Sequence, residues 1–396
     1  MDNSVYYVWL SLALGPQNPR YSALLAAFGN AKEIYDEDDY IKRIPTLKLS
    51  ETQLRRLNNK NLDKAMEICA KCISGGYGIL TYHDRLFPDR LKIISSPPPL
   101  LYYRGKLKNL NEECLISLVG TRSMTNYGRQ VTRQFSRAFA ASGAVVVSGM
   151  AKGVDSEAHS GCLEENGYTV AVLGTGIDNP YPKESVGLYH EIIKRGLVIS
   201  EFYPGSPAHA HNFPIRNRVI SGISSATVIT EAGSRSGALI TAKLAIMQGK
   251  DVFALPGLTG SEQSTGTNML LQKGVSLAYR PSDVLSKLEL VYPDKIHIPA
   301  SAYKTESISP FPKSMLSETA AETPKKPQKP SFDMGELEPM EKAIVTLLKG
   351  EAGGLIPDAI IEKTLADPSD VLSSLTVLEI YNIVVEDEFG KYSLKS

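Results

Sequence analysis

Short apolar runs alternate with helical segments that end at glycines through the middle of this 396-residue chain. The runs are rich in valine, isoleucine and leucine, and they are continuous, which is typical of strands buried on both faces of a parallel sheet. The alternation predicts an α/β fold with a doubly wound and mostly parallel sheet. The predicted strands span 115–119, 144–148, 169–173, 197–200, 226–230, 251–254 and 275–278.

The loops that follow the predicted strands are rich in glycine, serine, threonine and basic residues. They include GTRSMTNYG, SGMAKGVD, GTGIDNPYPK and EAGSRSG. In a doubly wound sheet these loops gather at the carboxyl edge, where ligands bind. A row of backbone N–H groups, hydroxyls and guanidinium groups suits a run of phosphates. The sequence therefore predicts a groove for a polyanion at this edge.

The turn after the first of these strands carries the strongest anion signal. Gly120 is expected to take a backbone conformation that other residues avoid, and Arg122 offers a planar group that matches a phosphate. Thr121, Ser123 and Thr125 add short donors close to a helix N-terminus. The dinucleotide fingerprint GxGxxG is absent.

Charge and cysteine content narrow the class of protein. Residues 101–280 carry 18 basic and 13 acidic side chains, whereas residues 333–396 carry 5 basic and 13 acidic ones, so an anionic partner should prefer the middle. No apolar run approaches the roughly 20 residues of a membrane span, so we expect a cytoplasmic protein. Cys69 and Cys72 form a lone CxxC with helical spacing around it, and we expect them to pack in a helix.

Composition and pattern divide the chain into four parts. The first is a small helical domain, and residues 75–108 are predicted to hold a short strand and an extended connector into the sheet. The last part reads as three helices and a hairpin, which suggests a winged helix. Its acidic surface would repel duplex DNA, so we expect it to contact protein. The predicted parts are a SAM-like or helix-hairpin-helix-like domain at 1–74, an extended Rossmann-like domain at 75–290, a flexible linker at 291–333 and a winged-helix-like domain at 334–396.

Metal and catalytic signals are weak. Asp155, His159, His209 and His211 could supply ligands, but His209 and His211 point apart in an extended segment. Asp155 is more simply a helix cap, and His159 a packed residue one turn later. GxSxG and the Walker A pattern are both absent, so we expect no metal, no cofactor and no enzymatic activity.

Several stretches resemble, in order and spacing, the DprA/Smf family of bacterial DNA-processing proteins over about residues 80–285. They are VGTRSMTNYG, VVVSGMAKGVDSEAH, AVLGTGIDNPYPKE, FPIRNRVISGIS, TEAGSRSGALITAKLAIMQGKDVFALPG and STGTNMLLQKG. The resemblance implies an extended Rossmann-like domain that binds single-stranded DNA without sequence preference and forms a homodimer. It also implies that the protein protects incoming DNA and loads the RecA recombinase in natural transformation and recombination.

The resemblance carries DNA contact onto Arg122 and Lys183, and the matching stretches add Arg216 and Arg218. These last two could instead belong to a structural ion-pair network in which Glu231 or Glu201 supplies the acid. The full set of expected DNA or phosphate contacts is Gly120, Thr121, Arg122, Ser123, Ser148, Gly149, Lys152, Lys183, Arg216, Asn217, Arg218, Ser236 and Gly237.

Two questions stay open at the level of sequence. Base stacking needs an aromatic ring in the groove, and the sequence does not say which of the nearby aromatics faces it. The alternative function is that of a Rossmann-like nucleotide N-glycosidic hydrolase. That class needs an acidic residue downstream in its glycine-rich loop, and EAGSRSGAL has none there, which favours binding over hydrolysis. The nearby aromatics are Tyr127, Tyr181, Phe202, Tyr203 and Phe213.

Overall fold

The chain, in this computed structural model, divides into two units, Met1–Lys304 and Thr305–Ser396. None of the described helices is long and apolar enough to cross a membrane. The residues that the structure describes are 3–40, 44, 47–303, 337–351, 353–380, 383–387 and 390–395.

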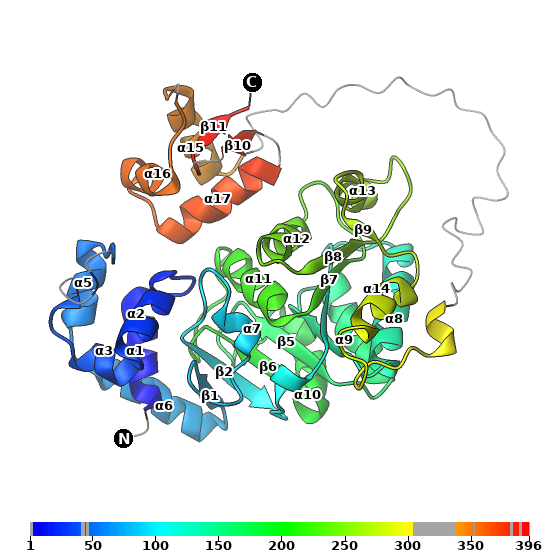
Figure 1. Cartoon of the computed structure of the whole chain (residues 1–396), viewed down its shortest axis with the longest axis horizontal. Helices are drawn as coiled ribbons and strands as arrows, with labels where there is room; N and C mark the ends of the chain where they lie inside the picture. Colours follow the sequence, from blue (N-terminus) through cyan, green and yellow to red (C-terminus); the bar gives the residue numbers. More distant parts are fainter. Residues whose placement is uncertain are drawn as a thin grey trace. The chain divides into compact units, whose positions relative to one another are not determined.

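A sheet of nine strands forms the centre of the described part of the first unit (Figure 1). Its order is β1-β2-β6-β5-β4-β3-β7-β8-β9. The last seven strands of this order, from β6 through β3 to β9, run parallel to one another. β2 pairs with β6 in the antiparallel sense, and β1 with β2 likewise. The strands are β1 Gly78–Thr81, β2 Leu100–Gly105, β3 Leu115–Val119, β4 Val145–Ser148, β5 Thr169–Leu173, β6 Leu197–Ser200, β7 Ala226–Ile229, β8 Asp251–Ala254 and β9 Ser276–Leu277.

The prediction of a mostly parallel α/β sheet is confirmed. Four of the seven predicted strands have the predicted bounds, and the other three differ by one residue at one or both ends. The prediction of an extended connector before the sheet is wrong, because Leu100–Gly105 is strand β2. Three prolines precede it, and since proline has no N–H for a ladder, the apolar run reads as a connector until Leu100.

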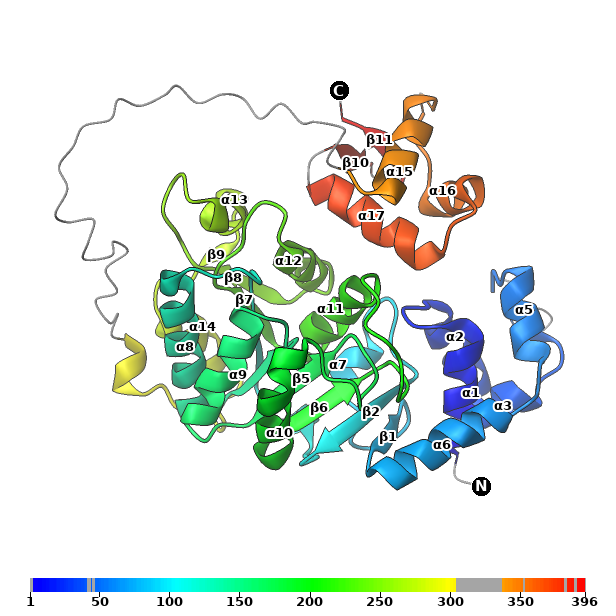
Figure 2. The same ribbon diagram turned by 180° about the vertical axis from the view of Figure 1, so that it is seen from behind.

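Helices cover both faces of the sheet. α8, α9 and α10 pack side by side over one face (Figure 2), while α11 and α12 pack together on the other. The chain therefore steps from β3 outward to β6 and returns to place β7 beside β3, which makes the β3–β7 gap the topological switch point. The helices are α7 Asp89–Lys92, α8 Asn126–Ala141, α9 Val154–Glu164, α10 Val186–Arg195, α11 Asn212–Ile223, α12 Gly237–Met247, α13 Thr265–Gln272 and α14 Pro281–Glu289.

The N-terminal helices lie next to the β1 edge (Figure 1) and share a core with the sheet. Val8 and Leu24 belong to the same buried cluster as Tyr102 of β2 and Ala171 of β5. Cys72 packs into this cluster from α6, as expected for the CxxC. These helices are α1 Ser4–Leu14, α2 Arg20–Phe28, α3 Ala31–Asp36, α5 Glu51–Asn58 and α6 Asp63–Gly75.

The second unit has three helices and a two-stranded antiparallel sheet among its described residues, around a core of its own. These are the elements expected there, and the winged-helix assignment itself stays a prediction. Its elements are α15 Pro339–Lys349, α16 Pro357–Thr364, α17 Pro368–Ile380, β10 Val384–Glu386 and β11 Tyr392–Leu394.

The predicted start of the linker at residue 291 is too early. Ile296 and Ala302 are buried, and the His297 N–H donates to the Ser142 carbonyl at 3.0 Å. These residues therefore pack on the sheet domain. Residues 304–333 of the predicted linker lie outside the described residues.

A buried ion pair ties α11 to the end of β6. One terminal nitrogen of Arg218 donates to both carboxylate oxygens of Glu201, at 2.6 and 2.8 Å. The side chains are only 3% and 4% exposed, so neither charge has access to solvent. Removing one partner would leave the other charge buried and unpaired.

We therefore expect Glu201→Gln to lower the free energy of unfolding by about 3–5 kcal/mol, measured by urea denaturation. The matched control is Asp36→Asn, which removes one partner of the exposed Lys32–Asp36 pair and should cost less than about 1 kcal/mol. Equal losses in the two variants would contradict the structural importance of the buried pair.

Candidate nucleic-acid interface

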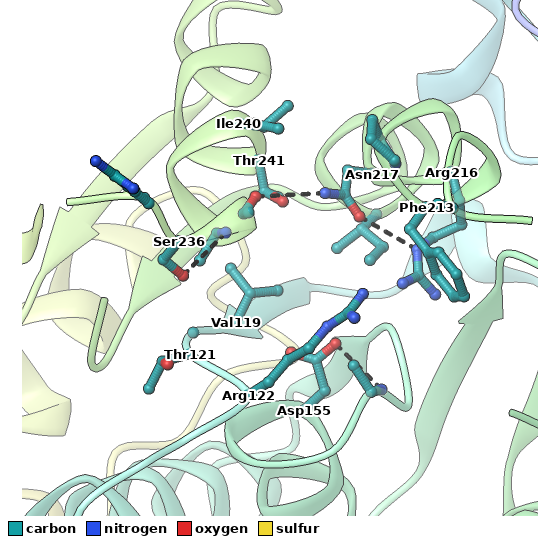
Figure 3. Close-up of a pocket in the computed structure, with 18 of the residues that line it drawn as sticks. Val119, Thr121, Arg122, Asp155, Phe213, Arg216, Asn217, Ser236, Ile240 and Thr241 are labelled. Atoms are coloured by element: carbon teal, nitrogen blue, oxygen red, sulfur yellow. Dashed lines mark hydrogen bonds between the residues drawn. The ribbon is translucent and has the colours of Figure 1, made fainter. Parts of the chain in front are cut away.

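A cavity of about 570 Å³ opens at the carboxyl ends of the parallel strands, at the switch point between β3 and β7. Loops after five strands contribute to its wall, because parallel strands bring all their carboxyl ends to one edge (Figure 3). The residues that line it are Val119, Gly120, Thr121, Arg122, Ser123, Ala151, Asp155, Tyr181, Ala208, Ala210, Phe213, Pro214, Arg216, Asn217, Ile220, Arg235, Ser236, Gly237, Ala238, Ile240 and Thr241.

Gly120 is needed for close packing and not for an unusual backbone conformation, which corrects the expectation from the sequence. A Cβ there would lie 2.6 Å from the Glu231 carbonyl oxygen and 2.6 Å from Val154 Cγ2. The left-handed backbone occurs instead at Gly153, with φ of 91°. A Cβ at Gly153 would also lie 2.4 Å from the Thr121 carbonyl oxygen. The turn after β3 is therefore pressed between β7 and the start of α9.

The anion at the N-terminus of α8 is the protein's own Glu231. Its carboxylate accepts from the Thr125 N–H at 2.8 Å and from the Thr125 hydroxyl at 2.7 Å. Its carbonyl accepts from the Thr121 N–H at 2.7 Å. A Cβ on Gly128 would come within 2.1 Å of the same carboxylate, so glycine makes room for it. Thr125 is therefore committed to Glu231, and the expectation that it donates to a phosphate is wrong.

Arg122 points into the cavity beside an aromatic ring (Figure 3). Its guanidinium carbon lies 5.2 Å from the centre of the Phe213 ring, within the range of a cation–π contact. Tyr181 lies on the Phe213 ring as well, with 5.5 Å between the ring centres. Arg122 itself is exposed, so its N–H groups are accessible to a ligand. The cavity therefore combines a free cation with a planar apolar surface.

Arg216 forms the inner end of the cavity. It is buried, and it donates to the Gly149 carbonyl at 2.7 Å and to the Val172 carbonyl. Burial lowers the pKa of Arg216 to about 10, while the nearby Asp155 carboxylate acts against this. Burial likewise raises the pKa of Asp155, opposed by Arg216. A Cβ on Gly149 would lie 2.7 Å from both side chains, so this glycine lets them meet.

The structure brings eight of the thirteen predicted contact residues to the cavity wall. Ser148 is buried and donates its hydroxyl proton to the Leu118 carbonyl, while Gly149 lies behind Arg216. Lys152 and Lys183 are exposed but lie outside the wall. Arg218 is sealed in its ion pair with Glu201, so the prediction that it lines the groove is corrected in favour of the structural network. The eight at the wall are Gly120, Thr121, Arg122, Ser123, Arg216, Asn217, Ser236 and Gly237.

Sequence reasoning missed Asp155 as a cavity residue. It sits in the first turn of α9 and makes no cap bond to the helix; its carboxylate accepts from the Ala151 N–H at 3.4 Å. Of the aromatic candidates, Tyr181 and Phe213 line the cavity, whereas Tyr127 donates to the Pro256 carbonyl elsewhere. The placement of Phe213, three residues before Arg216 on one helix, is a spacing signal that could have been used.

The HAH segment is turned and not extended, so its two histidines do not point apart as they would in an extended segment. The His209 and His211 rings are stacked, 5.3 Å between centres and 9° between planes. Within the described ranges no three His, Cys, Asp or Glu side chains are grouped closely enough to hold a metal ion.

Comparisons with known proteins identify the family to which the sheet domain is similar. The family model of DNA recombination-mediator protein A matches residues 78–289. Protein Smf of Synechocystis sp. is 36% identical over 335 residues, 79% of this chain and 79% of that protein. DNA processing protein DprA of Streptococcus pneumoniae is 38% identical over 206 residues, 52% of this chain and 72% of that protein.

Two solved structures are similar as well. DNA processing protein A of Streptococcus pneumoniae superposes with a TM-score of 0.63 at 30% identity, covering 72% of this chain and 98% of that one. DNA processing protein A of Helicobacter pylori, whose single-stranded DNA binding mode has been described, has a TM-score of 0.50 at 31% identity. That match covers 55% of this chain and 97% of the other.

His159 lies on α9, fully buried, with Nδ1 2.7 Å from the Thr169 hydroxyl. That hydroxyl donates its proton to the Val146 carbonyl, so it accepts from a protonated Nδ1. Burial, together with the charge of Arg216, lowers the pKa of His159 to about 3. The imidazole is therefore neutral in the folded protein at neutral pH.

We expect His159 to make the fold less stable in acid. The unfolded chain takes up this proton near pH 6.5, whereas the folded chain does so only near pH 3. The free energy of unfolding should therefore fall by up to about 1.4 kcal/mol for each pH unit below 6.5. When the free energy of unfolding is measured by urea denaturation from pH 7 to 5, its decrease with falling pH should be smaller in His159→Gln than in the wild type. Parallel slopes would contradict the buried neutral imidazole.

Proposed function

Because the chain belongs to the DNA recombination-mediator protein A family, we propose that it binds single-stranded DNA in the switch-point cavity and along the adjoining loops. The protein contacts mainly the sugar-phosphate backbone of the DNA, and binding is independent of the DNA sequence. The observation that carries this proposal is Arg122, which stands exposed over the Phe213 ring at the mouth of a cavity rich in arginine. A phosphate and a base could thus be held by neighbouring groups.

Phosphate contact falls to Arg122 first. It is exposed, whereas Arg216 already donates to two backbone carbonyls and Glu231 neutralises the start of α8. Arg216 then contributes mostly through its charge. Hydroxyls of Thr121 and Ser123 lie on the same turn and add neutral donors to phosphate oxygens.

Base contact falls to the aromatic pair. Every base has a flat face, so stacking on Phe213 or Tyr181 gives affinity without reading the sequence. The one amide at the wall, Asn217, is already engaged: its oxygen accepts from Arg216 Nε at 3.2 Å, and its nitrogen donates to the Gly237 carbonyl at 3.4 Å. This arrangement supports a site that tolerates all four bases.

Lys152 and Lys183 extend the proposed path of the strand. Both follow strands that end at the same edge as the cavity, and both are exposed. A strand that leaves the cavity would meet them within the same row of loops. The family consists of DNA-processing proteins and not of known enzymes, so the comparisons do not favour the nucleotide hydrolase alternative.

We further propose that the protein protects incoming DNA and loads the RecA recombinase during natural transformation. This part rests on the resemblance to DprA/Smf proteins. A protein that holds a strand by its backbone at one sheet edge leaves the rest of its surface available for such a partner.

A homodimer is also proposed, through the β9 edge of the sheet. β9 is the outermost strand, and its outer edge offers unpaired backbone groups. Leu277 of β9 and Tyr279 just after it are 52% and 55% exposed. Two copies related by a two-fold axis could pair these edges and cover both side chains.

The DNA-binding proposal predicts a loss of affinity in Arg122→Ala. Fluorescence anisotropy of a labelled single strand should show binding that weakens with salt, resists duplex competitor, and falls about tenfold or more in the variant. The slope of the logarithm of the binding constant against the logarithm of the salt concentration should also decrease in magnitude by about one, since one phosphate contact is lost. The matched control is Arg56→Ala, which removes an exposed arginine of α5 that does not line the cavity. This variant should bind as the wild type does. Equal affinity in both variants would contradict the assignment.

The dimer proposal predicts that Leu277→Lys is monomeric. Light scattering coupled to size exclusion should report twice the chain mass for the wild type and the single mass for the variant. Ile73→Lys adds the same charge at an exposed apolar residue of α6, 82% accessible, and should leave the mass unchanged. A dimer that persists in Leu277→Lys would place the contact elsewhere.

A further inference from the structure

The switch-point cavity has the size of a small-molecule site. Its volume of about 570 Å³ lies within the range of about 300–1,000 Å³ that is typical of ligand pockets. Most of a DNA strand must therefore lie outside it, with one nucleotide unit inside. A free nucleotide would need none of the outer contacts to enter the same space.

The charge of the cavity favours a terminal phosphate. Its wall holds three arginines, Arg122, Arg216 and Arg235, and a single carboxylate, that of Asp155. An internucleotide phosphate carries one negative charge, whereas a terminal monophosphate carries about −1.5 to −2 at pH 7. We propose that the cavity also binds a free nucleoside 5′-monophosphate, which competes with DNA for it. The competition, though not the binding itself, rests on the proposed DNA-binding function.

Asp155 limits the number of phosphates. Its buried carboxylate faces the same space as the arginines, so a longer phosphate chain would bring excess negative charge toward it. A triphosphate should therefore bind less well than a monophosphate.

The base would lie against the apolar wall. Phe213 and Tyr181 offer ring faces, and Val119, Ile220 and Ile240 add aliphatic surface to the same cavity. The oxygen and the nitrogen of the Asn217 amide each make a hydrogen bond within the protein, so this amide is held in place and not turned toward a base edge. Purine and pyrimidine monophosphates should bind with similar strength.

The direct test is titration calorimetry of the full chain with deoxyadenosine monophosphate and thymidine monophosphate. We expect both to bind, and deoxyadenosine, deoxyadenosine triphosphate and inorganic phosphate to bind at least about tenfold more weakly than the monophosphates. Arg122→Ala should lose about tenfold in affinity for the monophosphate, whereas Arg56→Ala should not change. In the anisotropy assay the monophosphate should release the labelled strand at concentrations set by its own dissociation constant.

The possible results separate the two proposals. DNA binding without monophosphate binding at millimolar concentration would overturn the inference and leave the DNA site standing. Monophosphate binding without DNA binding would overturn the proposed function and, with it, the competition. Monophosphate binding that is unchanged in Arg122→Ala, or no tighter than that of phosphate alone, would overturn the inference as well.

Discussion

The carboxylate of Glu231 joins the two halves of the doubly wound sheet at the point where they meet. Glu231 follows β7, yet its carboxylate accepts hydrogen bonds from Thr125 at the start of α8. Its backbone carbonyl accepts from the Thr121 N–H in the turn after β3. Gly120 leaves room for the carbonyl oxygen of Glu231, and Gly128 leaves room for its carboxylate. Since it supplies the negative charge that a helix N-terminus favours, the start of α8 is already neutralised, whereas Arg122 in the same turn stays exposed.

Two arginines on α11 have opposite surroundings although they are two residues apart. Residues at this spacing point to different sides of a helix. Arg216 reaches under the cavity to backbone carbonyls, and Arg218 reaches the Glu201 carboxylate on the other side. The first arginine keeps its charge near the ligand space, while the second has its charge neutralised within the fold. One helix thus serves both the cavity and the attachment of the loop after β6.

The sheet could be predicted from the sequence because its strands are continuous apolar runs between glycines, and such runs have few other uses in a domain of this size. β2 was hidden by the prolines before it. At the cavity, Arg122 and Ser236 could be predicted, since topology alone brings the loops after β3 and β7 together. Arg218 and Asp155 could not: pattern shows that a charged residue is present but not which way its helix turns it.

The neighbouring strands β3 and β7 are separated by about a hundred residues of chain. These residues form β4, β5 and β6, each placed further from β3, before the chain returns to form β7. Contacts between such distant segments form late, because the intervening loop must first be closed. The cavity should therefore be among the last features to appear as the domain folds. During synthesis, a chain that has not yet added β7 would hold Arg122 without the wall that faces it, so the cavity would remain incomplete until most of the sheet domain exists.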